Sequence, residues 1–186
     1  MKRREFLYNL HYQVDQLNPP DWEADWEDAP LPYKLYRGLQ TYPFTMEIPL
    51  TLDKAKMTSR PDFSTIGHFL WYTYGLTQVS QSLAYPGMDD HLYESARRFL
   101  PSGGALYPNE LYIYMKLEDL PSGIYHYDVA HHRLCLIREG NFDSYLSEVL
   151  GNQCDVASCF AVVIISAMFW KNFFKYHNFR THNISS

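Results

Sequence analysis

The spacing of hydrophobic residues along the chain predicts two amphipathic helices. In the stretch "PDFSTIGHFLWYTYG", apolar residues recur every three or four positions, which is the period of a helix with one buried face. Asp62 or Ser64 can cap its first turn, and Gly75 follows its last one. The stretch "NFDSYLSEVLGN" repeats this pattern over residues 142–150 and ends at Gly151, so it predicts a second helix.

A period of two predicts strands between and after these helices. Apolar residues alternate with tyrosines over residues 109–117, as they do in a strand with one face on the core. Residues 122–128 and 133–139 flank "VAHH" as a predicted hairpin, and the β-branched stretch 159–167 is expected to be a central strand. The segment 76–98 shows neither period, so it is predicted to be a loop with at most one helical turn. Helices mixed with antiparallel strands, without a repeating strand–helix–strand order, predict an α+β fold.

The first 50 residues differ in character from the rest. Residues 3–14 have helical spacing and predict a short amphipathic helix. Residues 17–39 are rich in proline and acidic residues, which predicts an extended arm that packs over the body or over a partner subunit rather than binding a basic peptide. We therefore expect an N-terminal helix and arm over residues 1–50 and an α+β domain over residues 51–186.

Composition and charge narrow the possible functions. The chain has 186 residues, 46% of them hydrophobic and 17% aromatic, which suits one domain with a real core. Its formal charge of −5 argues against nucleic-acid binding, which needs a clustered basic face. The three cysteines form no paired set, and the longest apolar run, 157–170, is too short to span a bilayer. These features predict a cytoplasmic protein that binds neither nucleic acid nor membrane.

The residue spacing gives little support to a metal site or a serine hydrolase. His126, His131, His132 and Cys135 are close in sequence but match no familiar zinc-binding pattern, so no metal site is expected. Ser102 lacks the preceding glycine of a nucleophile elbow.

The stretch "PSGGALYPNE", residues 101–110, is the most informative local motif. It follows the basic pair Arg97-Arg98 and precedes a predicted strand. It lacks the Lys and Ser/Thr of a phosphate-binding P-loop, and it lacks the dinucleotide-binding glycine pattern. Two interpretations stay open: a tight turn, or a bare backbone that a flat phosphorylated cofactor can approach closely.

Several segments together resemble a known enzyme family. They are "LPYKLYRG", "IGHFLWYTYGLTQ", "RRFLPSGGALYPNELYIY" and "SGIYHYDVAHHRLCLI". In their order and spacing they resemble the SagB/McbC-type dehydrogenases, the flavin-dependent branch of the nitroreductase superfamily that oxidises azolines to azoles in ribosomal peptides. The resemblance implies a nitroreductase-like fold, in which helices flank a mixed or antiparallel sheet, and FMN as the cofactor.

The resemblance also implies which residues contact the cofactor. Arg98, Ser102, Gly103, Gly104 and Ala105 match the family segment that lies along the flavin. Backbone N–H groups would face ring heteroatoms, the serine would contact ring or ribityl oxygens, and the arginine would supply charge.

The stretch "FWKNFFKYHNFR" supplies the Lys-Tyr pair of the family as Lys175 and Tyr176. The resemblance makes this pair the candidate for abstracting the Cα proton of an azoline, and neighbouring Lys171 and Arg180 would favour the Tyr176 phenolate. Without the resemblance, the same stretch is read as a basic surface cluster. Arg60 is the candidate contact of the flavin phosphate.

The implied partners are a modified peptide substrate, cyclodehydratase subunits and a second copy of the chain. Family members continue well past the Lys-Tyr pair, whereas this chain ends ten residues after Tyr176, so we expect a fold that is incomplete at its C-terminus. Two alternatives to the azoline dehydrogenase remain. One is an inactive remnant or peptide-binding subunit, and the other is a general NAD(P)H-dependent nitroreductase-like enzyme.

Overall fold

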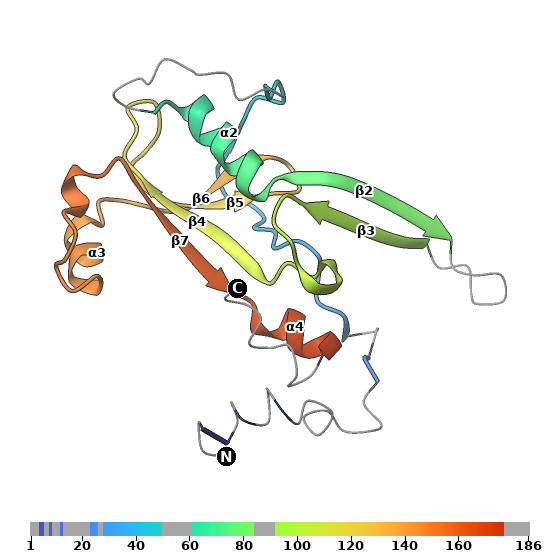
Figure 1. The fold of residues 1–186 in the computed structure, drawn as a ribbon. Helices are drawn as coiled ribbons and strands as arrows, with labels where there is room; N and C mark the ends of the chain where they lie inside the picture. The colour runs from blue at the N-terminus through green and yellow to red at the C-terminus, as the bar shows by residue number, and fades with distance from the viewer. Residues whose placement is uncertain are drawn as a thin grey trace. The chain divides into compact units, whose positions relative to one another are not determined.

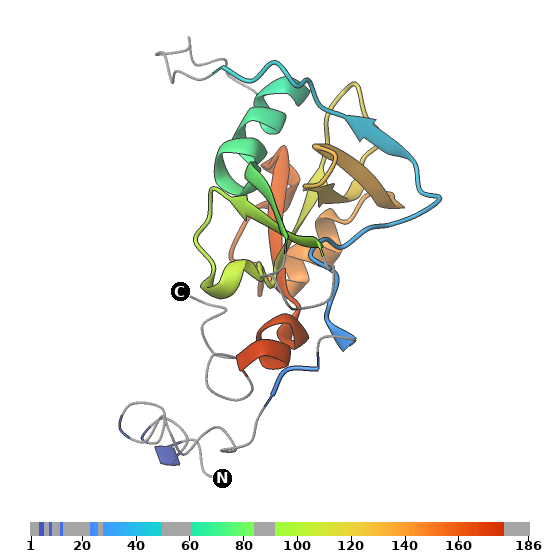
Figure 2. The same cartoon turned by 90° about the vertical axis from the view of Figure 1, so that its right-hand side faces the viewer.

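The structure is a computed structural model of the whole chain. It describes residues 4–5, 8, 12, 23–25, 28–49, 61–83 and 92–176. Their helices and strands are, in chain order, β1 (Thr41–Pro43), α2 (Phe63–Tyr74), β2 (Leu76–Leu83), β3 (Leu92–Arg98), the short 3₁₀ helix η3 (Gly103–Ala105), β4 (Asn109–Met115), β5 (Gly123–Asp128), β6 (Arg133–Glu139), α3 (Asp143–Val149), the 3₁₀ helix η4 (Val156–Ser158), β7 (Ala161–Ala167) and α4 (Phe169–Tyr176). Figures 1 and 2 show them in two views.

The described residues form two compact units. The sheet unit contains Tyr33–Ala105 and Leu111–Ile165, and the α4 unit contains Met1–Pro32, Leu106–Glu110 and Ser166–Ser186. The domain boundary that we predict near residue 50 falls in a stretch, 50–60, outside the described residues.

A five-stranded sheet with the strand order β1-β6-β5-β4-β7 is the centre of the sheet unit (Figure 1). The predicted strand at 109–117 and the predicted hairpin are confirmed as β4 and as β5–β6. The strands pair antiparallel, with Tyr112 opposite His126 and Tyr127 opposite Leu134. The sheet therefore brings residues far apart in sequence into cross-strand pairs.

Strand β7 lies at one end of this sheet, so the prediction of a central strand over 159–167 is wrong. Its β-branched residues correctly indicated a strand, but β propensity reports a fit to a pleated surface and not a position in the sheet. The side chains of Val163 and Ile165 are 45% and 66% exposed.

Helix α2 confirms the first predicted helix. Asp62 caps it, because its carboxylate accepts a hydrogen bond of 2.7 Å from the Thr65 backbone N–H. Its buried side chains include Ile66, Leu70 and Tyr74, which pack with β4, β5 and β6 in the main hydrophobic core. The apolar spacing of this helix also predicts Phe69 on its buried face, but Phe69 is 53% exposed.

A second, smaller core lies on the other face of the sheet. Tyr114 of β4, which is fully buried, packs there with Leu146 of α3 and Val156. This confirms the helix predicted over 142–150, which the structure bounds as Asp143–Val149. Strand β4 is consequently buried on both faces, although its alternation predicted a half-buried strand.

The segment 76–98 is not a loop but the antiparallel ribbon of β2 and β3. Ser80 lies opposite Ser95, and their hydroxyl groups are 2.8 Å apart. Most described side chains of β2 are exposed, including Val79 at 54%. Because this ribbon does not bury one face on the core, its sequence lacks the apolar–polar alternation that would have revealed it.

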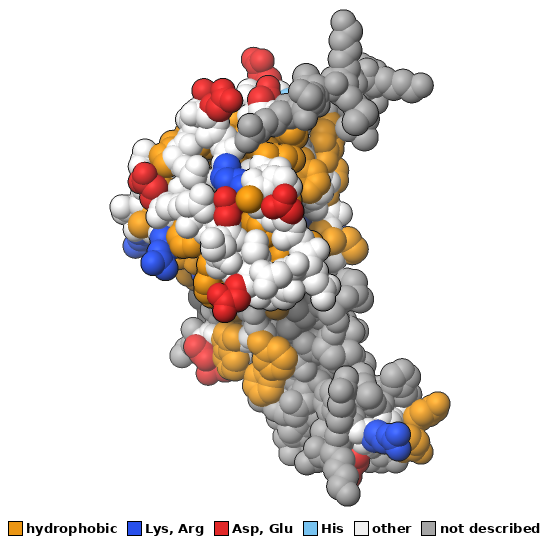
Figure 3. Space-filling view, turned by 90° about the vertical axis from the view of Figure 1, so that its left-hand side faces the viewer, with side chains coloured by type: hydrophobic (Ala, Val, Ile, Leu, Met, Phe, Trp, Pro, Cys, Tyr) orange, Lys and Arg blue, Asp and Glu red, His pale blue; other side chains and the backbone are white. Residues whose placement is uncertain are grey.

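The N-terminal predictions are only partly covered by the described residues. The four described positions within 3–14 are helical, and the described parts of the arm over 17–39 contain no α-helix. Among the residues that the structure describes, no helix is long and apolar enough to cross a membrane. On the face drawn in Figure 3, acidic side chains are scattered among hydrophobic ones and the basic side chains do not gather into a patch.

Candidate functional site

The loop between β3 and β4 has an unusual backbone. Gly104 has φ 65° and ψ 17°, and Ala105 follows it with φ 56°. The Ala105 N–H donates a hydrogen bond of 3.2 Å to the Ser102 carbonyl, which closes the turn. Two consecutive left-handed residues require a glycine at the first position and strain the alanine at the second.

The same loop presents main chain without side chains. Gly103 and Gly104 are exposed, and Ser102 and Ala105 are half-buried. A further left-handed residue, Tyr107 with φ 45°, follows two positions later. Strained non-glycine residues of this kind cluster at ligand sites, so the geometry fits the cofactor interpretation of "PSGGALYPNE" as well as the turn interpretation.

Arg98 ends strand β3, four residues before Ser102, and is only 5% exposed. Its guanidinium carbon lies 4.5 Å from the centre of the Tyr74 ring and 5.8 Å from that of Tyr33. These are cation–π distances, which fix the arginine against the aromatic core next to the loop. The sequence predicted the position of this arginine but gave no sign of its aromatic partners.

Helix α4 carries the predicted catalytic pair. Lys175 and Tyr176 are both half-buried, and the Lys175 ammonium lies 5.7 Å from the centre of the Tyr176 ring. This places the positive charge beside the phenol. The loop residues Ser102–Ala105 belong to the sheet unit, whereas the Lys-Tyr pair belongs to the α4 unit.

Lys171, one turn earlier on α4, has a different environment from the one that the sequence suggested. It is 1% exposed, and its ammonium donates to the Pro32 carbonyl at 3.1 Å and the Tyr107 carbonyl at 3.3 Å. It also lies 3.4 Å from Glu110, which is itself buried. Lys171 therefore anchors α4 and is not part of a basic surface around Tyr176. Arg60 and Arg180 lie outside the described residues.

A polar cluster that the sequence pattern did not reveal lies on the sheet unit. The Lys34 ammonium donates a hydrogen bond of 2.7 Å to the Tyr112 hydroxyl, which is 2.8 Å from the Tyr36 hydroxyl. We call Lys34, Tyr36 and Tyr112 the Lys34 cluster. Lys34 and Tyr36 are two positions apart in an extended segment, so their side chains leave it on the same side, and this spacing was the available signal.

The histidines near the β5–β6 turn have structural partners. Asp128 accepts hydrogen bonds of 2.9 Å from both His131 and Arg133, which braces the turn. His132 lies 2.9 Å from the Tyr127 hydroxyl, and burial lowers the pKa of its imidazole. No group of three or more potential metal ligands occurs in the part of the chain that the structure describes.

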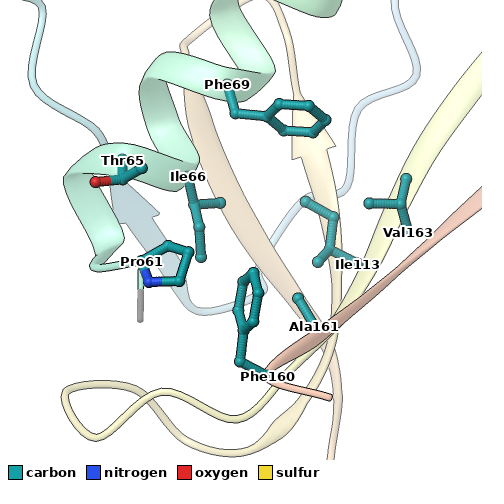
Figure 4. Close-up of a pocket in the computed structure, with 8 residues that line it drawn as sticks. All are labelled: Pro61, Thr65, Ile66, Phe69, Ile113, Phe160, Ala161 and Val163. Atoms are coloured by element: carbon teal, nitrogen blue, oxygen red, sulfur yellow. The ribbon is translucent and has the colours of Figure 1, made fainter. Parts of the chain in front are cut away.

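An apolar groove of about 300 Å³ lies between α2 and β7 (Figure 4). Ile66 and Phe69 of α2 lie on one side of it, Ile113 of β4 and Val163 of β7 lie on the other side, and Phe160 lies at its lower end in the view of Figure 4. No polar group other than Thr65 is found among its lining side chains. It has the shape of a hydrophobic site but lacks the polar groups that would orient a ligand.

Comparisons with known proteins point to one fold. No protein-family model matches the chain. The trifolitoxin-processing protein TfxB of Rhizobium leguminosarum bv. trifolii is 44% identical to it over 43 residues, which are 22% of this chain and 12% of that protein. A crystal structure of a protein described as a nitroreductase, from Anabaena variabilis, is similar with a TM-score of 0.66 and 24% sequence identity. That similarity covers 92% of this chain and 34% of the other, so this chain spans about a third of the length of its structural neighbour. The predicted nitroreductase-like α+β fold is confirmed.

Proposed function

We propose that the protein is an FMN-dependent oxidoreductase that oxidises azolines to azoles in a ribosomally made peptide. The observation that carries the proposal is the turn at Ser102–Ala105, where Gly103 and Gly104 expose main chain, Gly104 and Ala105 are left-handed, and the buried Arg98 lies four residues before Ser102. The nitroreductase-like fold supports it, and so does the partial match to a protein named as trifolitoxin-processing.

The residues of the loop fit FMN. Exposed peptide groups at Gly103 and Gly104 allow a flat ring to approach the main chain, and Ser102 and Ala105 flank them. Arg98 would supply positive charge to the site from its place between two aromatic rings. Bound FMN would supply the two-electron acceptor that this oxidation requires.

The chain itself must remove a proton. Converting an azoline to an azole breaks two C–H bonds on adjacent carbons and forms a C=C bond, so one hydrogen leaves as a proton and the other as a hydride. The Lys175–Tyr176 pair takes the Cα proton, and the Lys175 ammonium lies 5.7 Å from the centre of the Tyr176 ring. Oxygen or another acceptor then takes up the two electrons. The buried contacts of Lys171 hold the helix that carries this pair.

The proposed setting is the processing of a modified peptide, with cyclodehydratase subunits as partners and a homodimer as the working assembly. Arg60 is the proposed contact of the flavin phosphate.

The test uses the full chain, FMN and an azoline-containing peptide whose oxidation lowers its mass by two hydrogens. Lys175→Ala and Tyr176→Phe should keep FMN affinity within about twofold, because neither residue is proposed to touch FMN, and should slow oxidation by at least about a hundredfold. Oxidation at the parental rate in both variants would disprove the catalytic assignment. A full chain that binds the peptide but not FMN would support a peptide-binding subunit. Turnover of nitro compounds with NADPH and none of azolines would support a general nitroreductase.

A further inference from the structure

The Lys34 cluster is a positively charged site that has no carboxylate partner among the described residues. Lys34 is half-buried, and it forms no ion pair with any residue that the structure describes. In contrast, Lys116 and Lys171 form ion pairs with Asp143 and Glu110, respectively. A cation removed from water is stabilised by an opposite charge, so a half-buried lysine without one is an unusual feature.

The framework around Lys34 is rigid. Tyr112 of β4 lies opposite His126 of β5, and the ring of His126, which is 1% exposed, packs 5.1 Å from the Tyr112 ring and 5.0 Å from the Tyr36 ring. The Lys34 ammonium lies 5.4 Å from the centre of each tyrosine ring. The sheet and the edge-on and tilted contacts of these rings therefore hold the two hydroxyls and the ammonium in one place.

The cluster has more donors than its internal hydrogen bonds use. An ammonium carries three N–H donors and each phenol carries one O–H donor. The contacts from Lys34 to Tyr112 and between the two tyrosines use one hydrogen each. The donors that remain belong to the ammonium and to one phenol, so they lie beside a positive charge. Such a donor set suits the oxygens of an oxyanion.

The protonation states agree with a donor site and argue against a general base. The hydrogen bond to Tyr112 raises the pKa of the Lys34 ammonium, which thus stays charged at neutral pH. Burial raises the pKa of Tyr112, so its hydroxyl stays protonated and donates.

From this geometry we infer that Lys34, Tyr36 and Tyr112 form a binding site for an oxyanion, a carboxylate or a phosphate group carried by a ligand. Lys34 supplies the charge and its two remaining N–H donors, and the hydrogen-bonded pair of phenols supplies one O–H donor. The inference does not depend on the proposed oxidoreductase function.

The site is tested by titrating the ¹⁵N-labelled full chain with sodium acetate and, separately, with methyl phosphate, at constant ionic strength. Acetate represents a peptide carboxylate and methyl phosphate represents a nucleotide phosphate, so the tighter of the two identifies the source of the oxyanion. We expect saturable shifts of the amide signals of Tyr36 and Tyr112. Lys34→Met should raise the dissociation constant at least about tenfold, and Tyr112→Phe about threefold or more.

Arg37→Met is the matched control, because it removes a positive charge from an exposed side chain three positions after Lys34. It should leave the dissociation constant within about twofold of the parental value. Shifts that rise linearly with both anions, or equal affinities in the parent, Lys34→Met and Tyr112→Phe, would overturn the inference. Tyr112→Phe removes only a hydroxyl group, so the test stands even if Lys34→Met does not fold.

Discussion

Lys171 is buried and Lys34 is half-buried, and the two lysines have different kinds of partner. Lys171, in the α4 unit, is surrounded by two backbone carbonyls and the buried carboxylate of Glu110. Lys34, in the sheet unit, contacts only tyrosine hydroxyls and rings among the residues that the structure describes. The first arrangement holds the fold together. The second leaves donors available for a ligand, so the partners of a buried charge indicate whether it serves structure or binding.

Among these lysines, substitution of Lys171 is expected to reduce stability the most. Lys171→Met leaves the Glu110 carboxylate, which is 3% exposed, without the ammonium that it contacts. We expect the free energy of the opening that exposes the α4 amides to hydrogen exchange to fall by about 3 kcal/mol or more. Hydrogen exchange measured by mass spectrometry on peptides covering Phe169–Tyr176 checks this. Unchanged protection would show that the buried pair does not anchor the helix.

Lys116 should give an intermediate effect. Its ammonium contacts Asp143 at 2.8 Å and donates to the carbonyls of Val156 and Ala157. Because Lys116 directly follows β4, these contacts join the end of β4 to α3 and η4. Lys116→Met should lower the free energy of unfolding by about 1–3 kcal/mol, measured by urea denaturation. If Lys116→Met lowers the free energy of unfolding no more than the substitution of an exposed lysine does, Lys116 does not stabilise the contact between these elements.

The same pair predicts a pH dependence. The hydrogen bond from Lys116 lowers the pKa of Asp143 in the folded protein, so the pair stabilises the fold above the unfolded pKa of this carboxyl and is lost as the pH falls through the folded pKa. The unfolding free energy of the parent should therefore fall more steeply below about pH 4 than that of Asp143→Asn. Parallel curves for the two proteins between about pH 5 and pH 2 would contradict the shift.

The smallest effect on stability is expected at Lys34. Lys34→Met leaves no carboxylate behind and keeps the alkyl part that packs on the tyrosine rings. The free energy of unfolding should change by less than about 1 kcal/mol, although anion binding is lost. A loss equal to that of Lys171→Met would show that Lys34 is structural and would remove the contrast between the two lysines.

The sequence predicted the elements whose periodicity faces a core, because burial on one face imposes the pattern. Helix α2, the β5–β6 hairpin and β4 were identified in this way. The β2–β3 ribbon was missed because it is mostly exposed and carries polar residues such as Ser80 and Ser95. The position of β7 in the sheet was also mispredicted, because strand propensity carries no information on strand order.

In the candidate site, too, the local backbone could be predicted from the sequence and the tertiary contacts could not. The left-handed turn at Gly104 was predictable, because a Gly-Gly pair marks backbone that other residues adopt poorly. The partners of the charged residues were not predictable. Lys171 meets Glu110 across 61 positions and Lys34 meets Tyr112 across 78, and only tertiary structure brings such pairs together.

The most direct test of the proposed function is the affinity of the full chain for FMN when a methyl group is added to the bare turn. Gly104 has φ 65°, and Gly38, an exposed glycine with φ 74° and open space around it, offers a control with a similar backbone conformation. Both alanine substitutions strain the backbone by about 1–2 kcal/mol, but only one adds a side chain to the proposed cofactor surface. We expect flavin fluorescence titration to show tight binding to the parent and to Gly38→Ala, and at least about tenfold weaker binding to Gly104→Ala. Equal FMN affinity in all three proteins, or no binding to the parent, would contradict it.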